Sequence, residues 1–281
     1  MIKLLKPGFF TTIQDSGRFG YRNIGVPVAG AMDLIAYATG NELLGNSSEA
    51  ASMEITMTGP TLLFAVKTAI AITGANMSPK INDEPVNNNN VIQVSKGDIL
   101  SFGKLISGFR AYLAISGGFQ TEKVMGSRSY MKPITTHDRL TENETILITN
   151  NAEEDNTLTA INKEVNEDYL TSNELQALKG PEFDLLTEQQ KNQILNTDFT
   201  VSKENNRMAY QLTQYIDSHS HTMITSAALP GTIQLTPEGK LIVLMRNGQT
   251  TGGYIRILQL TERAVCILAQ KKYNDVLKIT F

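Results

Sequence analysis

Short apolar runs bounded by turn residues recur along most of this 281-residue chain and limit what it can fold into. Such runs predict strands, and many of them at this spacing are typical of barrels and sandwiches. A proline-glycine turn at residues 237–239 lies between two runs and predicts a hairpin. The predicted strands are residues 61–71, 91–94, 99–102, 111–115, 145–149, 199–201, 208–212, 232–235, 241–245, 254–260, 265–269 and 276–281.

Only two segments have the pattern of helices. Residues 33–44 carry apolar residues at helical spacing, and Asp33 can cap their first turn. Thr187 and Gln190 have the form of a capping box, which predicts a short helix over residues 188–195. The sequence therefore predicts a mainly β protein with a few helices.

A polar stretch divides the chain into two parts. Residues 151–171 are rich in Asn, Glu, Asp and Thr and have few apolar side chains, which indicates a solvated linker. We expect a first lobe over residues 1–150 and a second lobe over residues 172–281.

Composition and charge exclude several classes of protein. The chain has an apolar fraction of 41%, a net charge of −3 and a pI near 5.7, which argues against nucleic-acid binding. No apolar run is long enough to span a membrane. The single cysteine, Cys266, excludes an internal disulfide, so we expect a reducing, cytoplasmic location and a buried apolar thiol.

Common catalytic and metal-binding motifs are absent from the sequence. We find no phosphate-binding loop, no dinucleotide-binding glycine motif, no zinc-protease motif and no nucleophile elbow. His219 and His221 are two residues apart, but His137 is the only other histidine. A metal site needs further ligands, so the histidine pair favours a polar loop and we expect no metal.

One stretch, residues 11–33, crowds together residue types that a chain does not need merely to fold. Gln14, Asp15, Arg18, Tyr21 and several glycines occur within it. Glycines let the backbone approach a ligand closely. Asp15 and Arg18 can form a charged pair of fixed geometry.

This stretch resembles the biotin-dependent carboxyltransferase family, also called the allophanate hydrolase subunit 2 family. A second specific block, residues 249–254, carries the resemblance near the C-terminus, and shorter matches run over nearly the whole chain. The shorter matches include Glu54, Gly59-Pro60, residues 108–114, residues 126–129, Gly180-Pro181-Glu182, Arg207, Tyr210 and residues 231–234. The resemblance implies two cyclophilin-like β-barrel lobes.

The resemblance also implies an activity and partners. Similar proteins serve as the C subunit of an ATP-dependent 5-oxoprolinase, a hydrolase complex that converts 5-oxoproline to glutamate. The implied partners are a kinase-inhibitor-like protein (the B subunit) and a lactam-utilisation-type protein (the A subunit), and the chain alone is expected to be inactive. Two alternatives stay open: the carboxyltransferase component of a biotin-dependent urea or amide carboxylase, and a regulatory antagonist that binds a kinase-inhibitor-like partner.

The candidate site combines fixed donors with amide groups. Three arginines are candidates for stabilising an anionic oxygen: Arg18, Arg128 and Arg207. The alternative is that they are structural and pair with nearby acidic side chains. Gln14 and Gln249 can both donate to and accept from an amide or lactam, or can tie down a loop. The candidate substrate-binding residues are Gln14, Asp15, Arg18, Tyr21, Met32, Asp33, Glu54, Arg128, Ser129, Arg207, Tyr210, Gln234, Gln249, Thr250, Thr251, Gly253 and Tyr254. No catalytic residue is predicted.

The sequence departs from the family pattern near these blocks. Asn247 stands where the family has Asp, Ile255 where it has Pro and Ala209 where it has Gly, and residues 134–140 replace a glycine-rich turn. If the family Asp is catalytic, activity is in doubt, whereas Asn247 followed by Gly forms a turn well. The sequence contains no recognised phosphate-binding loop for ATP. Residues 250–253 are the one candidate for a backbone anion nest.

Overall fold

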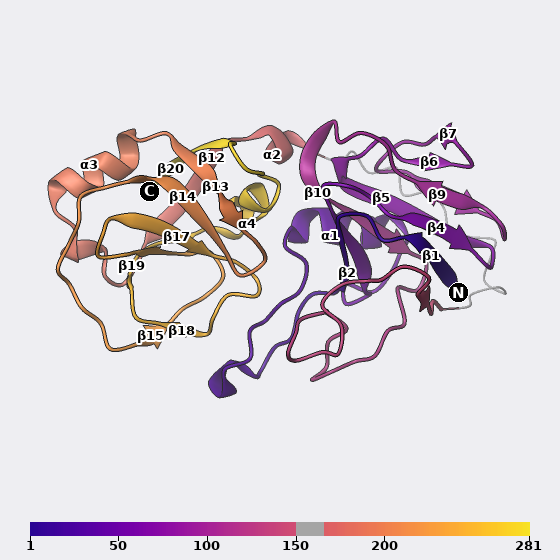
Figure 1. Cartoon of the computed structure of the whole chain (residues 1–281), viewed down its shortest axis with the longest axis horizontal. Helices are drawn as coiled ribbons and strands as arrows, with labels where there is room; N and C mark the ends of the chain where they lie inside the picture. Colours follow the sequence, from indigo (N-terminus) through magenta and orange to yellow (C-terminus); the bar gives the residue numbers. More distant parts are fainter. Residues whose placement is uncertain (150–165) are drawn as a thin grey trace. The chain divides into compact units, whose positions relative to one another are not determined.

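The computed structural model describes residues 1–149 and 166–281 and divides the chain into two compact units (Figure 1). The first unit consists of Met1–Arg18 and Asp33–Leu170, and the second of Phe19–Met32 and Thr171–Phe281. Residues 19–32 thus belong to the second unit although they lie early in the sequence. Most of the predicted linker, residues 151–171, lies outside the described residues, and its described end forms α2 (Asp168–Thr171).

Two sheets build the described part of the first unit. One has the order β11 (Thr145–Ile146), β1 (Ile2–Lys6), β4 (Thr61–Phe64), β9 (Ile99–Ser101), β6 (Lys80–Ile81) and β7 (Glu84–Pro85). The other has the order β2 (Phe10–Gln14), β3 (Ser52–Thr56), β10 (Ser107–Ile115), β5 (Thr68–Asn76) and β8 (Val91–Val94). The pairs between neighbouring strands are antiparallel, as β2 with β3 and β10 with β5.

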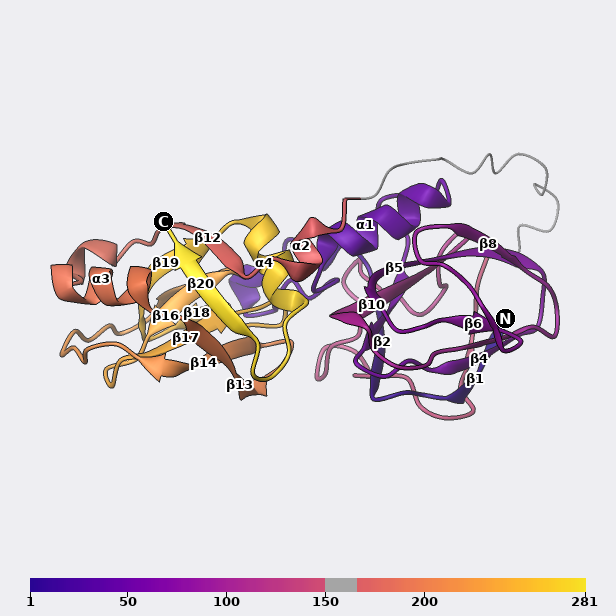
Figure 2. The same ribbon diagram turned by 90° about the horizontal axis from the view of Figure 1, so that it is seen from above.

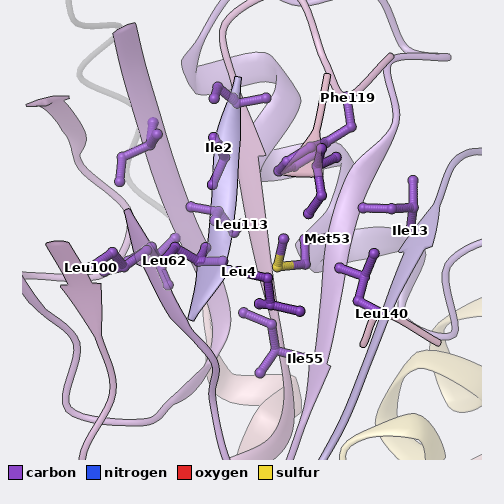
Figure 3. Close-up of a cluster of buried hydrophobic side chains, with 14 of the residues drawn as sticks. Ile2, Leu4, Ile13, Met53, Ile55, Leu62, Leu100, Leu113, Phe119 and Leu140 are labelled. Carbon is purple, nitrogen blue, oxygen red and sulfur yellow. The ribbon is translucent and has the colours of Figure 1, made fainter. Parts of the chain in front are cut away.

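Apolar side chains from both sheets meet in the core of the first unit (Figure 3). Ile2 and Leu4 of β1 alternate with more exposed residues, as a strand with one buried face requires. They join Ile13, Met53 and Leu113 from the other sheet. Each such side chain contributes about 1.5–3 kcal/mol by leaving water, so this shared core holds the two sheets together.

Helix α1 (Leu34–Leu43) packs against β5 and β10, as Figure 2 shows for β5. Asp33 caps it as predicted, accepting the backbone N–H groups of Ile35 and Ala36 at 3.0 and 3.1 Å. A Cβ at Gly40 would lie 3.1 Å from the Cβ of Ala114, so the missing side chain lets the helix approach the sheet closely. This packing places the helix N-terminus, with Asp33, inside the unit.

The second unit is a closed barrel. Its strands follow the order β12 (Glu174–Lys179), β19 (Ile255–Leu260), β16 (Thr232–Leu235), β17 (Lys240–Leu244), β14 (Ala209–Tyr215), β13 (Phe199–Asn205) and β20 (Val276–Thr280). The β16–β17 pairing confirms the hairpin predicted around residues 237–239. A small sheet of β15 (Ser226–Ala227) and β18 (Thr251–Gly252) is separate from the barrel strands.

Helices complete the second unit. The short 3-10 turns are η1 (Arg22–Ile24) and η2 (Phe183–Leu185). Helix α3 (Glu188–Asn196) begins with the predicted capping box of Thr187 and Gln190. Helix α4 (Glu262–Ala269) shows that the strand predicted over residues 265–269 is wrong. A short apolar run does not distinguish a buried helix from a strand, and Thr261 decides the case by capping Ala264 N–H at 3.3 Å.

The mainly β prediction is confirmed, with differences in detail. The predicted strand 61–71 is two strands, β4 and β5, separated by a turn. No strand was predicted at β1, β2, β3 and β12 or at the two-residue strands β6, β7, β15 and β18. Cys266 is buried, as expected, and forms no disulfide among the described residues. Among the described residues, no helix has the length and hydrophobicity that crossing a bilayer requires.

Candidate functional site

Asp15, directly after β2, organises a buried polar cluster in the first unit. Its carboxylate accepts from the Ser127 and Ser129 hydroxyls at 2.7 and 2.6 Å and from the Gly17 and Arg128 backbone N–H groups at 2.9 and 2.6 Å. Only 4% of Asp15 is exposed. Charged acceptors make the stronger hydrogen bonds, so this one carboxylate fixes the segment around residues 127–129 against the end of β2.

Arg18 holds the same segment from a second direction. Its Nε donates to the Val124 carbonyl at 3.0 Å and its Nη2 to the Ser129 carbonyl at 2.9 Å. The predicted ion pair between Arg18 and Asp15 is not formed, because both groups are occupied by this segment. Burial lowers the pKa of Arg18, and the charge of Asp15 opposes that shift. Nη1 of Arg18 is buried and has no hydrogen-bond partner among the described residues.

Two further candidates adjoin the cluster. Gln14 Nε2 donates to Thr12 Oγ1 at 3.0 Å and to the Tyr130 carbonyl at 3.2 Å. The half-buried Arg128 donates through Nη2 to Gln120 Oε1 at 2.7 Å. Of the two roles left open for Gln14, tying down a loop is the one these bonds show.

Glu54 and Asp33 belong to a second buried polar network in the first unit. The Tyr112 hydroxyl donates to Glu54 Oε2 at 2.8 Å and accepts from the Asp33 backbone N–H at 2.8 Å. Tyr169 donates to Asp33 Oδ2 at 2.8 Å, and Arg110 Nε lies 3.8 Å from Glu54 Oε1. Burial raises the pKa of Tyr112, and the charges of Glu54 and Asp33 raise it further, so its hydroxyl remains a donor.

In the second unit, residues 19–32 run along the barrel loops. Arg22 donates to the Ala228 carbonyl, and Arg207 Nη2 donates to the Gly30 carbonyl. Tyr21 is half-buried, and its carbonyl accepts from the Ile24 and Val26 backbone N–H groups, both at 3.2 Å. Met32 is fully buried. One of these bonds is donated by the segment and the other is accepted by it, and together they fix its path.

Asn247 contributes an acceptor to the same region. Its Oδ1 accepts from Arg207 Nη2 at 3.3 Å, and its backbone N–H donates to the Arg207 carbonyl at 2.8 Å. An aspartate would offer the same acceptor, so the departure at this position preserves the contact. Tyr210 of β14 lies deeper, where its hydroxyl donates to the Lys271 carbonyl at 3.1 Å.

The amides of Gln234 and Gln249 converge on Gly252. A Cβ built at Gly252 would lie 2.5 Å from Gln234 Nε2 and 2.9 Å from Gln249 Nε2. Gln234 is 1% exposed, and its Nε2 has no hydrogen-bond partner among the described residues. Ser226, which pairs with Gly252 between β15 and β18, also has a buried hydroxyl without a described partner. We call these four residues the glutamine cluster.

The rest of the second specific block surrounds the glutamine cluster. Thr250 is buried, and its carbonyl accepts from the Ala228 N–H at 3.0 Å. Thr251, Gly253 and Tyr254 are exposed. Thr251 lies in β18, and the glycines that follow it do not adopt the left-handed backbone conformation. A backbone anion nest alternates right- and left-handed residues, so residues 250–253 do not fit a phosphate.

The histidines do not form a metal centre in the described part of the chain. His219 and His221 stack with ring centroids 5.6 Å apart, and His219 Nε2 lies 3.3 Å from the Leu235 carbonyl. No group of three or more His, Cys, Asp or Glu side chains suited to a metal occurs among the described residues.

The predicted residues thus fall into two sets, one in each unit. The first unit holds Gln14, Asp15, Arg18, Asp33, Glu54, Arg128 and Ser129, and the second holds the others. Sequence reasoning missed Ser127, Tyr112, Tyr169 and Ser226. Ser127 and Tyr112 stand inside the family blocks 126–129 and 108–114 and could have been found there, whereas no pattern in the sequence distinguishes Tyr169 and Ser226.

Comparisons with known proteins identify the family of this chain. A family model described as carboxyltransferase domain, subdomain A and B, matches residues 24–281. The 5-oxoprolinase C subunit of Escherichia coli (strain K12) is 31% identical over 96% of this chain and 87% of its own length. The urea amidolyase of Lachancea kluyveri is 45% identical over 45% of this chain and 7% of its own length.

A solved structure shows the same fold. The structure titled TTHA0988 superposes on all of this chain with a TM-score of 0.88 at 20% identity, and the chain spans 56% of that protein. The family model covers most of the chain, and the E. coli relative matches nearly all of it. This chain therefore belongs to the family of the carboxyltransferase domain, subdomains A and B.

Proposed function

We propose that this chain is the C subunit of an ATP-dependent 5-oxoprolinase complex and that the glutamine cluster binds the lactam. The E. coli relative carries that name and matches nearly the full length of both chains. A 28% identical relative from Haemophilus influenzae carries the same name and matches 99% of this chain. The chain acts as part of a hydrolase complex that opens 5-oxoproline to glutamate.

The unpartnered amide of Gln234 is the observation that carries this proposal. A buried donor left without a partner costs about 1–3 kcal/mol, and buried polar groups in folded proteins are nearly always paired. A ligand that accepts from Gln234 removes this cost. The lactam carbonyl oxygen of 5-oxoproline can accept from Gln234 Nε2 and Gln249 Nε2, and the Ser226 hydroxyl can accept its ring N–H.

ATP hydrolysis belongs to the assembled complex in this proposal. Residues 250–253 lack the left-handed backbone of an anion nest, and we assign ATP to the complex as a whole. The partners are a kinase-inhibitor-like protein, the B subunit, together with a lactam-utilisation-type protein, the A subunit. The complex works in the cytoplasm.

A second candidate is the carboxyltransferase component of a biotin-dependent urea or amide carboxylase. The 45% identity to a urea amidolyase over 128 residues favours it. Urea also presents a carbonyl oxygen and N–H groups, so the glutamine cluster suits it equally well. The regulatory antagonist has less support, because Asn247 keeps the Arg207 contact that an aspartate would make.

Phosphate release that depends on 5-oxoproline tests the proposal. The chain is purified with its two partners, and each protein is then omitted in turn. We expect release only when all three are present and no effect of avidin, which sequesters biotin. Activity of the two partners without this chain contradicts the proposal. Dependence on urea and a biotinylated carrier supports the carboxylase instead, and tight partner binding without any turnover supports the antagonist.

A further inference from the structure

A pocket of about 250 Å³ lies in the first unit, and none of its lining residues belongs to the glutamine cluster. It is formed by residues 120–122, 124, 130, 135–137 and 144–147. The pocket has a size suited to a small organic molecule. Binding of a lactam by the glutamine cluster does not explain it, because that cluster belongs to the second unit.

Two polar groups of the pocket lack hydrogen-bond partners among the described residues. Tyr130 lines the pocket and is only 8% exposed, yet its hydroxyl makes no hydrogen bond there. The Thr121 hydroxyl is buried and also has no described partner. Buried hydroxyls are usually paired, so the unpaired Thr121 hydroxyl is prepared to bind a ligand. The Tyr130 hydroxyl offers a second unpaired oxygen on the pocket wall.

The charge of the pocket is negative. Glu122 and Glu144 line it, and no lysine or arginine occurs among its lining residues. Glu144 Oε2 accepts from the Thr141 N–H and hydroxyl at 2.9 and 3.2 Å, which leaves Oε1 available. Burial raises the pKa of Tyr130 to about 12, and the charge of Glu144 contributes, so the hydroxyl stays neutral beside the carboxylate. His137 stacks on Tyr130 with ring centroids 5.7 Å apart.

Hydrogen bonds from Arg18 and from the adjoining Arg128 and Gln14 hold the walls of this pocket in place. Arg18 binds the Val124 carbonyl, and Arg128 binds Gln120 Oε1. Gln14 binds the Tyr130 carbonyl. A wall fixed by buried hydrogen bonds loses little entropy when a ligand binds, so the pocket is preformed.

We propose that this pocket binds a small organic cation, specifically a primary ammonium group on an apolar body. An ammonium group has three donors and no acceptor, which matches Glu144 Oε1 and the Tyr130 and Thr121 oxygens. Val124, Ile146 and Leu147 supply apolar surface for the body of the ligand. 5-Oxoproline carries a carboxylate and lacks a cationic group, so the ligand of this pocket differs from the proposed substrate.

Three probes of the same shape and different charge test this inference on the full chain by titration calorimetry. Benzylamine is a cation at neutral pH, benzyl alcohol is neutral and benzoate is an anion. We expect benzylamine to bind at least about tenfold more tightly than benzyl alcohol, a difference of about 1.4 kcal/mol, and benzoate not to bind. Equal binding of all three, or no binding of benzylamine, overturns the proposal, as does a preference for benzoate.

Matched variants locate the binding. Glu144→Gln and Tyr130→Phe each remove one polar group of the pocket. Glu122→Gln removes a carboxylate of the pocket at an exposed position, where a substitution should not disturb folding. We expect each to weaken benzylamine binding about three- to tenfold. Glu142→Gln removes an equal charge from an exposed residue outside the pocket and should leave binding unchanged. Equal loss in Glu122→Gln and Glu142→Gln indicates non-specific attraction and refutes the site.

Discussion

Replacing Gly252 by alanine tests the glutamine cluster directly. The new methyl carbon would lie 2.5 Å from Gln234 Nε2 and 2.9 Å from Gln249 Nε2. Ordinary contact begins near 3.4 Å, so the two nitrogens must retreat by about 0.9 and 0.5 Å. A displacement of this size in a positioned group costs about 10²-fold in rate, so we expect kcat/KM for 5-oxoproline in the assembled complex to fall by about that factor.

The stability of the Gly252→Ala variant should change little. Gly252 does not have a left-handed backbone, so alanine introduces no backbone strain there. Alanine in a strand gains about 0.5–1 kcal/mol over glycine, and moving a side chain off its rotamer costs about 0.5–1.5 kcal/mol. The free energy of unfolding, measured by urea denaturation, should therefore stay within about 1 kcal/mol of the parent.

Gly253→Ala is the matched control. A Cβ at Gly253 would meet only the Ile224 and Met223 carbonyls at 3.7 Å, which is ordinary contact. We expect this variant to keep the activity and the stability of the parent. If Gly252→Ala retains activity within about twofold, the Gln234 and Gln249 amides do not position the substrate and the argument fails. If both variants lose activity equally, the loop matters for a reason other than these donors.

Three further predictions concern polar side chains that the structure pairs or leaves unpaired. Gln234→Met removes an unpartnered buried donor, so we expect the free energy of unfolding in urea to stay equal or to rise by up to about 1 kcal/mol. The 5-oxoproline-dependent activity should be lost. A marked loss of stability would mean that the amide is already paired. Asp15→Ala leaves four donors unpaired and should cost about 3–5 kcal/mol, whereas Asp198→Ala, in an exposed pair with N···O 3.6 Å, should cost less than about 1 kcal/mol. Glu182, bonded to Arg256 at 2.7 Å, has its pKa lowered from 4.5, chiefly by that bond, so its stabilisation is present above pH 4.5 and disappears as the pH falls through the folded value. The stability difference between the parent and Glu182→Gln should therefore shrink in acid, and a difference that is constant between pH 7 and pH 3 would contradict this assignment.

Local sequence patterns correctly predicted the elements whose conformation depends on residues close together in the sequence. The caps at Asp33 and Thr187 formed as expected because a cap involves only the next three residues. The β16–β17 hairpin formed because its turn joins adjacent strands. Residues 265–269 were predicted wrongly because an apolar run is compatible with both a helix and a strand when it is buried on all sides.

The family motifs identified which residues belong to the site, and the sequence by itself determined the strand-rich class and the chemistry available. Only the tertiary structure decided which of those residues meet. Asp15 binds Ser127 across 112 positions, and Gln234 is left unpaired beside Gly252. Contacts at such separations form only when the strands have packed around a common core, because the chain entropy lost in closing these long loops is offset by apolar burial and not by local propensity.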